Sequence, residues 1–214
     1  MKHLIIIGVG GFAREVFCHA KDSIGYGSEW DIKGFLDGDV LLSSKEYEKL
    51  QVPVLGDIFS YSIEKDDVFI CAIADPKTKE RLVGIIQSRG GVFINLIHNT
   101  ALLEGNIELG VGNILSPHVI LTDCIKVGDF VSFNIGCKIG HDVEICDYSS
   151  FMGGVILCGF VHIGCRVFMA TYAVAVPHAK IQDDVYVGAG SVAMKRISAG
   201  KTVFGNPAVP IDRG

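Results

Sequence analysis

Residues 139–163 read IGHDVEICDYSSFMGGVILCGFVHI, and within them an apolar residue stands at every sixth position. The positions are Ile139, Ile145, Phe151, Leu157 and Ile163. The same spacing continues in both directions, so that every sixth residue from Ile97 to Ala199 is apolar. Four places after these residues, from Val119 to Val203, a second series is mostly small or aliphatic. Such a period differs from that of an α-helix and from the simple alternation of an ordinary strand.

A six-residue period is typical of a parallel β-helix, in which short strands joined by tight corners stack coil upon coil. Three hexads make one triangular coil of about 18 residues, so residues 97–204 predict six coils without an insertion, roughly 29 Å tall. The alternative, an antiparallel sandwich, predicts a period of two with irregular turns.

The residues before the repeat predict a different, α/β fold. Residues 4–7 are an apolar run, residues 8–11 form a glycine-rich turn, and the apolar residues from Phe12 to Ala20 fall at helical spacing. Further strands are expected at 32–36, 68–74 and 92–96, and Asp75-Pro76 signals a helix start. We therefore predict two domains: a Rossmann-like half domain around a small parallel sheet at 1–96, and an all-β helix at 97–214.

Composition excludes several classes of function. The chain has 214 residues, a formal charge of −5 and a pI near 5.8, so it has no basic footprint for nucleic acid. Residues 148–179 contain a single formal charge, Arg166, but polar residues interrupt them too often for a membrane span. No signal peptide is recognisable, and the chain is expected to be cytoplasmic.

The seven cysteines of the chain include no C-x-x-C pair, which indicates neither a disulfide framework nor a metal site. Cys71, Cys124 and Cys158 are expected to be reduced core residues.

Two groups of motifs carry a family resemblance. The repeats Ile139-Gly140-His141-Asp142-Val143 and Ile163-Gly164-Cys165-Arg166-Val167, with the tail at 200–208, resemble the left-handed β-helix acyltransferases of the hexapeptide-repeat superfamily. The segment 8–16 (GVGGFAREV), followed by Gly34-Phe35-Leu36-Asp37, narrows this to sugar acetyltransferases of the sialic-acid O-acetyltransferase-like family. The chain looks close to the bacterial nucleotide-activated amino-sugar N-acetyltransferases. The resemblance implies a left-handed helix, a homotrimer, acetyl-CoA as co-substrate and a role in surface glycan biosynthesis.

His141 is the candidate catalytic base. Acyl transfer from a thioester needs a base that takes a proton from the attacking amine or hydroxyl, and a neutral imidazole suits this at pH 7. Asp142 directly follows His141 and would stabilise its charged form. By itself the pair fits a solvated corner better than a catalytic site, but the family's catalytic His, followed by an acidic residue, matches it in register and reverses that preference.

Other candidate residues concern the donor. Gly159 lies one coil beyond His141 and should stack on it, with its N–H available for an oxyanion or for the thioester carbonyl; the alternative is a plain corner glycine. The resemblance adds Thr171 and Ala189 as acetyl-CoA contacts. It adds Ser150 as well, although some relatives carry a histidine there and serine cannot share a proton at neutral pH.

The turn at 8–13 fits G-x-G-x-x-G/A, a pattern typical of a dinucleotide site. Only 96 residues precede the repeat, enough for one mononucleotide half, so the turn is expected to hold the diphosphate of a nucleotide sugar. The alternative is a tight turn without a ligand. By resemblance the acceptor-binding residues are Gly10, Gly11, Phe12, Asp37, Gly38 and Ala74, with Phe12 in place of a histidine found in some relatives.

These observations predict an acetyl-CoA-dependent enzyme that N-acetylates a nucleotide-linked amino sugar by direct transfer, with His141 as general base. Two alternatives stay open: O-acetylation of a sugar hydroxyl, as in sialic acid, and a non-catalytic nucleotide-sugar binding module. The weakly charged segment 148–179 is expected to line the pantetheine groove and a subunit contact.

Overall fold

The computed structural model describes residues 1–37 and 50–211, which divide into two compact units, Met1–Asn99 and Thr100–Gly214. The division falls three residues beyond the expected boundary at 96/97. No helix in the described part of the chain is long and apolar enough to cross a membrane.

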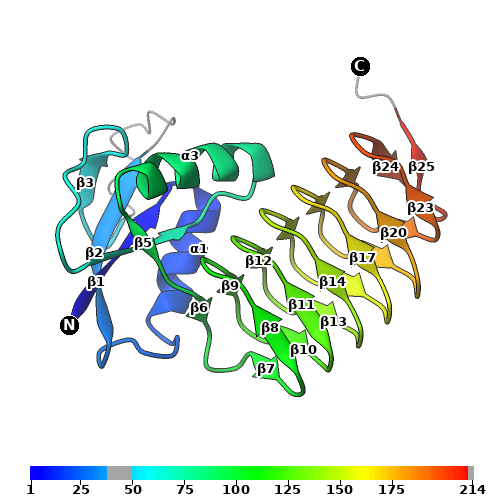
Figure 1. Cartoon of the computed structure of the whole chain (residues 1–214), viewed down its shortest axis with the longest axis horizontal. Coiled ribbons are helices and arrows are strands. Elements are labelled where there is room, and N and C mark those ends of the chain that lie inside the picture. The colour runs from blue at the N-terminus through cyan, green and yellow to red at the C-terminus, as the bar shows by residue number, and fades with distance from the viewer. Residues whose placement is uncertain (38–49, 212–214) are drawn as a thin grey trace. The chain divides into compact units, whose positions relative to one another are not determined.

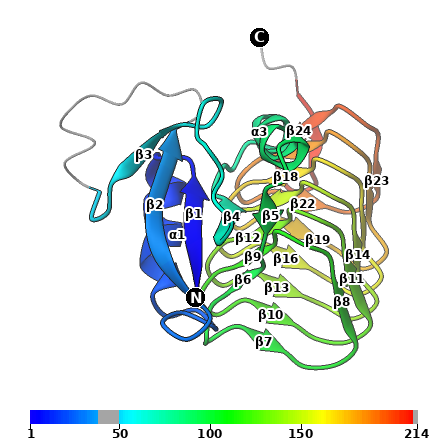
Figure 2. The ribbon, with the colours of Figure 1, turned by 60° about the vertical axis from the view of Figure 1, so that its left-hand side comes forward.

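The first unit holds a parallel sheet with strand order β3-β2-β1-β4-β5. Figure 2 shows β1 between β2 and β4. The elements are β1 (Lys2–Ile7), α1 (Gly11–Ala20), β2 (Trp30–Asp37), β3 (Val54–Asp57), β4 (Asp67–Cys71), α3 (Pro76–Ser88), β5 (Val92–Phe93) and β6 (Leu96–Ile97). The predicted small parallel sheet is confirmed. The edge strand β3 was not predicted, because four residues that include Gly56 carry no clear period.

The starts of the two helices differ in a way that matters below. At α3 the Asp75 carboxylate accepts a hydrogen bond from the Thr78 N–H (2.8 Å) and Pro76 is the first helical residue, as the sequence predicted. At α1 the N-cap is Gly10, with no side-chain cap and no acidic residue in the first turn. Within residues 1–37 and 50–211, the first N–H groups of α1 therefore have no capping side chain.

The second unit is a triangular prism whose coils step from β7 (green) to β24 (orange-red) in Figure 1. Its first face contains β7 (Leu102–Leu103), β10 (Ile120–Leu121), β13 (Lys138–Ile139), β16 (Ile156–Leu157), β19 (Val174–Ala175) and β22 (Val192–Ala193). The second contains β8 (Ile107–Leu109), β11 (Ile125–Val127), β14 (Glu144–Ile145), β17 (His162–Ile163), β20 (Lys180–Ile181) and β23 (Arg196–Ile197). The third contains β9 (Ile114–Leu115), β12 (Ser132–Phe133), β15 (Ser150–Phe151), β18 (Phe168–Met169), β21 (Tyr186–Val187), β24 (Thr202–Phe204) and the antiparallel β25 (Val209–Pro210).

The residues at every sixth position form the core of the prism. From Leu115 to Ala193 each of them is buried, and the second series from Val119 to Val203 is buried as well. Within the core the stacked rings of Phe133 and Phe151 lie 5.3 Å apart. The apolar period thus predicted the inward-facing side chains correctly over this range.

The prediction of a repeat without interruption is wrong in the last coil. Lys180 pairs with Arg196, a step of 196 − 180 = 16 residues instead of 18, and Tyr186 pairs with Thr202 after the same step. In the shortened coil Ala199 lies at the surface, and Ile197 and Val203 take the core positions that pair with Ile181 and Val187. The residue at 199 is apolar, so the period alone could not reveal the slip.

A second correction concerns the cysteines. Cys146 and Cys165 are joined by a disulfide although they are 19 residues apart, one coil plus one residue. Cys165 occupies the corner position at which other coils carry Asp129, Asp147 and Asp183, each accepting a backbone N–H one coil earlier. Of the three expected core thiols, Cys71 is buried, Cys158 is half-buried and Cys124 is exposed, because it occupies a corner with positive φ.

Candidate functional site

A pocket of about 210 Å³ lies at the carboxyl ends of the first unit's central strands. The chain leaves β1 toward β2 on one side and returns to β4 on the other, and such a switch point is where open α/β sheets bind ligands. Five predicted acceptor residues line the pocket: Gly10, Gly11, Phe12, Asp37 and Ala74. Gly38 lies outside the described residues.

The glycines of the turn are not all explained by the fold. Gly8 has a φ of +107°, and a side chain there would meet Ile73 Cδ1 at 2.8 Å, so its glycine is a structural requirement. A Cβ on Gly10 would have no neighbour within 4 Å, and one on Gly11 would meet only an Arg14 Nη2 at 4.0 Å. The absence of side chains at Gly10 and Gly11 keeps the start of α1 open to a ligand.

Ile73, Thr78 and Leu82 also line this pocket and were not predicted from the sequence. Thr78 lies in the first turn of α3 and Leu82 one turn later. The strand order could have predicted this part of the pocket, because the loop after β4 and the helix that follows it must border the same switch point.

The candidate base lies on an edge of the prism. The turns 140–143, 158–161 and 176–179 join the first face to the second, and we call this edge the His141 edge. His141 Nδ1 lies 2.9 Å from the Asp142 carboxylate, and both side chains are exposed, by 58% and 44%. If Nδ1 carries the proton that the carboxylate accepts, Nε2 is left with a lone pair, as a general base requires. Asp142 has a φ of 57°, which aspartate tolerates better than most residues.

Gly159 stacks on His141, as the coil arithmetic predicted. A methyl group at Gly159 would lie 2.6 Å from His141 Cε1 and 2.8 Å from Nε2, so the imidazole occupies the space that the missing side chain leaves. Among the described residues the Gly159 N–H has no hydrogen-bond acceptor. The candidate base and a backbone N–H are thus adjacent, an arrangement that acyl transfer could use.

Two further residues of the His141 edge, Phe160 and His178, were not singled out from the sequence. The His141 and Phe160 rings are 5.1 Å apart at 87°, while Phe160 and His178 are stacked at 4.9 Å and 6°. The signal was available, because His178 follows Phe160 by one coil of 18 residues.

The predicted donor residues lie elsewhere in the chain. Thr171 and Ala189 are exposed in the turns 170–173 and 188–191, which join the third face to the first; we call this the Thr171 edge. Ser150 is fully buried in β15 on the third face. Within one chain the width of the first face separates Thr171 and Ala189 from His141, so these residues do not form one site.

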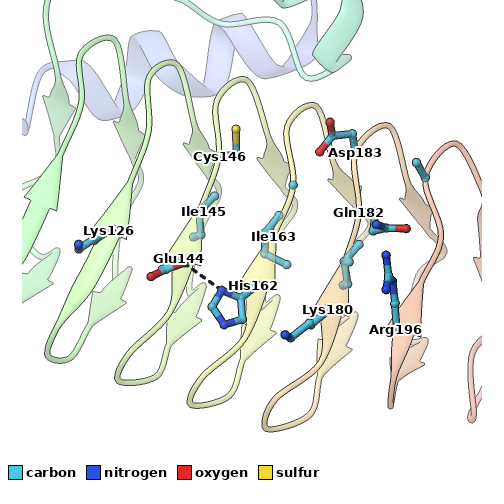
Figure 3. A pocket seen from close by; sticks show the side chains of 13 residues that line it. Lys126, Glu144, Ile145, Cys146, His162, Ile163, Lys180, Gln182, Asp183 and Arg196 are labelled. Carbon is cyan, nitrogen blue, oxygen red and sulfur yellow. Dashed lines mark hydrogen bonds and ion pairs between the residues drawn. The ribbon is translucent and has the colours of Figure 1, made fainter.

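The second face carries charged side chains over a shallow hollow of about 770 Å³. Figure 3 shows Lys126, Glu144, His162, Lys180 and Arg196 along it, with His162 Nδ1 3.0 Å from a Glu144 carboxylate oxygen. None of the predicted catalytic or substrate-binding residues lines this hollow. The hollow is lined by side chains that repeat from one coil to the next.

Comparison with protein families and solved structures agrees with this architecture. Residues 3–86 match the family model described as the PglD N-terminal domain. GDP-perosamine N-acetyltransferase of Escherichia coli O157:H7 is 30% identical over 221 residues, which cover 97% of this chain and 96% of that protein.

Two solved structures resemble the whole chain. PerB from Caulobacter crescentus, in complex with CoA and GDP-perosamine, has a TM-score of 0.86 and 25% identity, with 99% of this chain and 98% of PerB covered. The acetyltransferase domain of PglB from Neisseria gonorrhoeae, in complex with acetyl coenzyme A, has a TM-score of 0.87 and 25% identity, covering 98% and 99%. The prism is accordingly the left-handed β-helix of these enzymes. The chain belongs to the family of left-handed β-helix sugar acetyltransferases that includes GDP-perosamine N-acetyltransferase.

Proposed function

We propose that this acetyltransferase transfers the acetyl group of acetyl-CoA to the amino group of a nucleotide-linked amino sugar, as a cytoplasmic step of surface glycan biosynthesis. Two features carry the proposal: an open glycine turn at the switch point of the first unit, and a histidine packed on Gly159, whose N–H has no hydrogen-bond acceptor among the described residues. GDP-perosamine, which PerB binds, is the first acceptor to test.

The nucleotide diphosphate would bind at the start of α1. Its negative charge suits the uncapped N–H groups and the positive end of the helix, and Gly10 and Gly11 allow close approach. Asp37 ends β2 at the same pocket, where a carboxylate can accept a hydrogen bond from a ribose hydroxyl.

The chemical step is a direct transfer. The amine nitrogen attacks the thioester carbonyl carbon while His141 Nε2 takes the amine proton, and Asp142 holds the resulting imidazolium through Nδ1. The Gly159 N–H would donate to the oxyanion, and one such donor is worth about 3 kcal/mol. The C–S bond then breaks, and the departing thiolate receives the proton to give free CoA and an amide.

A homotrimer would complete the donor site. The outward residues of the first face are mainly apolar (Leu102, Ile120, Ile156, Val174 and Val192), with one charged residue, Lys138. Such a face favours contact with another copy. A cyclic arrangement could bring the Thr171 edge of one subunit to the His141 edge of its neighbour, so that Thr171 and Ala189 would contact the pantetheine arm there.

The test measures CoA release from acetyl-CoA with GDP-perosamine and with UDP- and dTDP-linked amino sugars. Transfer to at least one amine, and its loss by about a thousandfold or more in His141→Asn, is the expected result. Failure with every amine would reject N-acetylation, and a His141→Asn enzyme at full rate would reject the proposed base. Transfer to sialic acid but to no amine would instead establish the O-acetyl alternative.

A further inference from the structure

His141 is poorly fixed by its hydrogen bond alone. Its imidazole is more than half exposed, and so is nearly half of its partner Asp142. An exposed hydrogen bond contributes little to holding a side chain, because water competes for both groups. A base that must present Nε2 to a reacting amine needs a further contact to select one rotamer.

Phe160 supplies that contact. Its ring meets the His141 imidazole nearly perpendicularly, at 87° and 5.1 Å, which is a favoured arrangement for aromatic pairs. The Phe160 N–H also donates to the His141 carbonyl oxygen at 3.0 Å, so the two backbones are tied together. Gly159 leaves room for the imidazole, because a Cβ at this position would lie only 2.6 Å from His141 Cε1.

Phe160 is held in turn from the next coil. The His178 ring stacks on it at 4.9 Å and 6°, and the His178 N–H donates to the Gly159 carbonyl oxygen at 3.1 Å. The Phe160 ring is 42% exposed, so without this stack it would have little packing to fix it.

We infer that Phe160 is a positioning residue for acetyl transfer: stacked on His178, it holds the His141 imidazole against Gly159 with Nε2 directed to the acceptor amine. The inference rests on the proposed role of His141 as base. It predicts that the Phe160 ring affects the chemical step rather than substrate binding.

The experiment compares Phe160→Leu with Phe160→Tyr in CoA release with GDP-perosamine. Leucine removes the ring, so kcat should fall about tenfold with both KM values within about twofold. Tyrosine keeps the ring and should retain at least about half of kcat. In a His141→Asn background, Phe160→Leu should cause no further loss, since no imidazole remains to be positioned.

The matched control is Phe130→Leu. Phe130 also has positive φ and also stacks on a ring from an adjacent coil, Tyr148 at 5.3 Å, but it lies at the corner between the second and third faces. Its substitution should leave kcat unchanged. An equal loss in this control would mean that the effect of Phe160→Leu is general destabilisation and would overturn the inference.

A measurement independent of turnover separates this inference from the proposed function. The NMR signals of the His141 imidazole, assigned with His141→Asn, should shift in Phe160→Leu, because the ring current of Phe160 is lost, and should stay near their wild-type positions in Phe160→Tyr. Unchanged imidazole signals in Phe160→Leu would overturn the inference. A rise in the KM for the nucleotide sugar with unchanged kcat would also overturn the inference. It would mean that Phe160 binds substrate in the neighbouring hollow, which it lines together with Asp142. Absence of transfer by the wild type would reject only the proposed function.

Discussion

Gly159 shows how a missing side chain can define a site. In the prism the second residue after a first-face strand stacks on its counterpart one coil earlier, and at Gly159 that counterpart is His141. The imidazole fills the space above the glycine, so any side chain at Gly159 would compete with the base for the same volume. The glycine has no positive φ, which separates this steric role from a conformational one.

Gly159→Ala should therefore impair catalysis much more than folding. The new methyl group would displace the His141 ring, and a misplacement of about 1 Å can lower kcat by about 100-fold. The backbone accommodates alanine and the exposed imidazole can move, so the free energy of unfolding should change by less than about 1 kcal/mol. Steady-state kinetics and thermal unfolding on one preparation check both.

The control for this substitution is Gly84→Ala, in the exposed part of α3, where an added Cβ has no neighbour within 4 Å. It should leave kcat unchanged and raise stability by up to about 1 kcal/mol, the helix propensity difference. A Gly159→Ala enzyme with wild-type kcat would contradict the stacking argument.

The turn between β1 and α1 separates a glycine that the fold needs from one that the proposed diphosphate site needs. Gly10→Ala should preserve the melting temperature, because its Cβ meets nothing, but raise KM for the nucleotide sugar about tenfold by narrowing the approach to α1. Gly8→Ala should instead lower stability, because of its positive φ and its contact with Ile73. KM values for both substrates and unfolding curves test the contrast; an unchanged sugar KM in Gly10→Ala would locate the diphosphate elsewhere.

Helix α3 carries a buried lysine that makes stability depend on pH. Burial lowers the pKa of Lys79 to about 7, whereas the unfolded chain keeps the proton up to about 10.5. Between these values the unfolded state binds more protons, so stability should rise with pH from 7 upward, by at most about 1.4 kcal/mol per unit. Burial raises the pKa of the Cys71 and Cys137 thiols to about 12. Above about pH 9 these two thiols therefore lower the stability of the folded state as pH rises.

The measurement is urea unfolding between pH 7 and 8.5. Lys79→Met should flatten the rise, while the exposed Lys77→Met, in the same helix, should keep the wild-type slope. Equal slopes in wild type and Lys79→Met would show that Lys79 is charged in the folded protein.

The sequence predicted the regular parts of the prism and failed where the repeat becomes irregular. The six-residue period identifies inward residues because burial selects them coil after coil, and the same arithmetic paired His141 with Gly159. It could not reveal the short last coil, where Ala199 satisfies the pattern yet is exposed, nor the disulfide, for which one coil plus one residue must be counted. The part of the pocket that Thr78 and Leu82 line required the order of the strands, which no local pattern gives.

Within a single chain, the expected donor residues Thr171 and Ala189 lie far from the proposed base, His141. The His141 edge and the Thr171 edge border the same apolar first face, on opposite sides. In a closed ring of three identical prisms, each His141 edge would meet the Thr171 edge of a neighbour. The proposed trimer would then be required for catalysis, and no isolated chain would contain a complete site.

Subunit complementation tests this arrangement. His141→Ala removes the base, and Ala189→Trp should block the donor side with a large side chain, so each homo-oligomer should be inactive. In trimers reassembled from equal amounts of both, a site is intact when its His141 edge comes from the Ala189→Trp variant and its Thr171 edge from the His141→Ala variant, and about a quarter of sites satisfy this. Acetyl transfer should return to about a quarter of the wild-type rate after joint unfolding and refolding, and stay absent when the separately refolded proteins are mixed. No recovery in reassembled trimers, with their size confirmed by light scattering, would mean that both edges act within one chain.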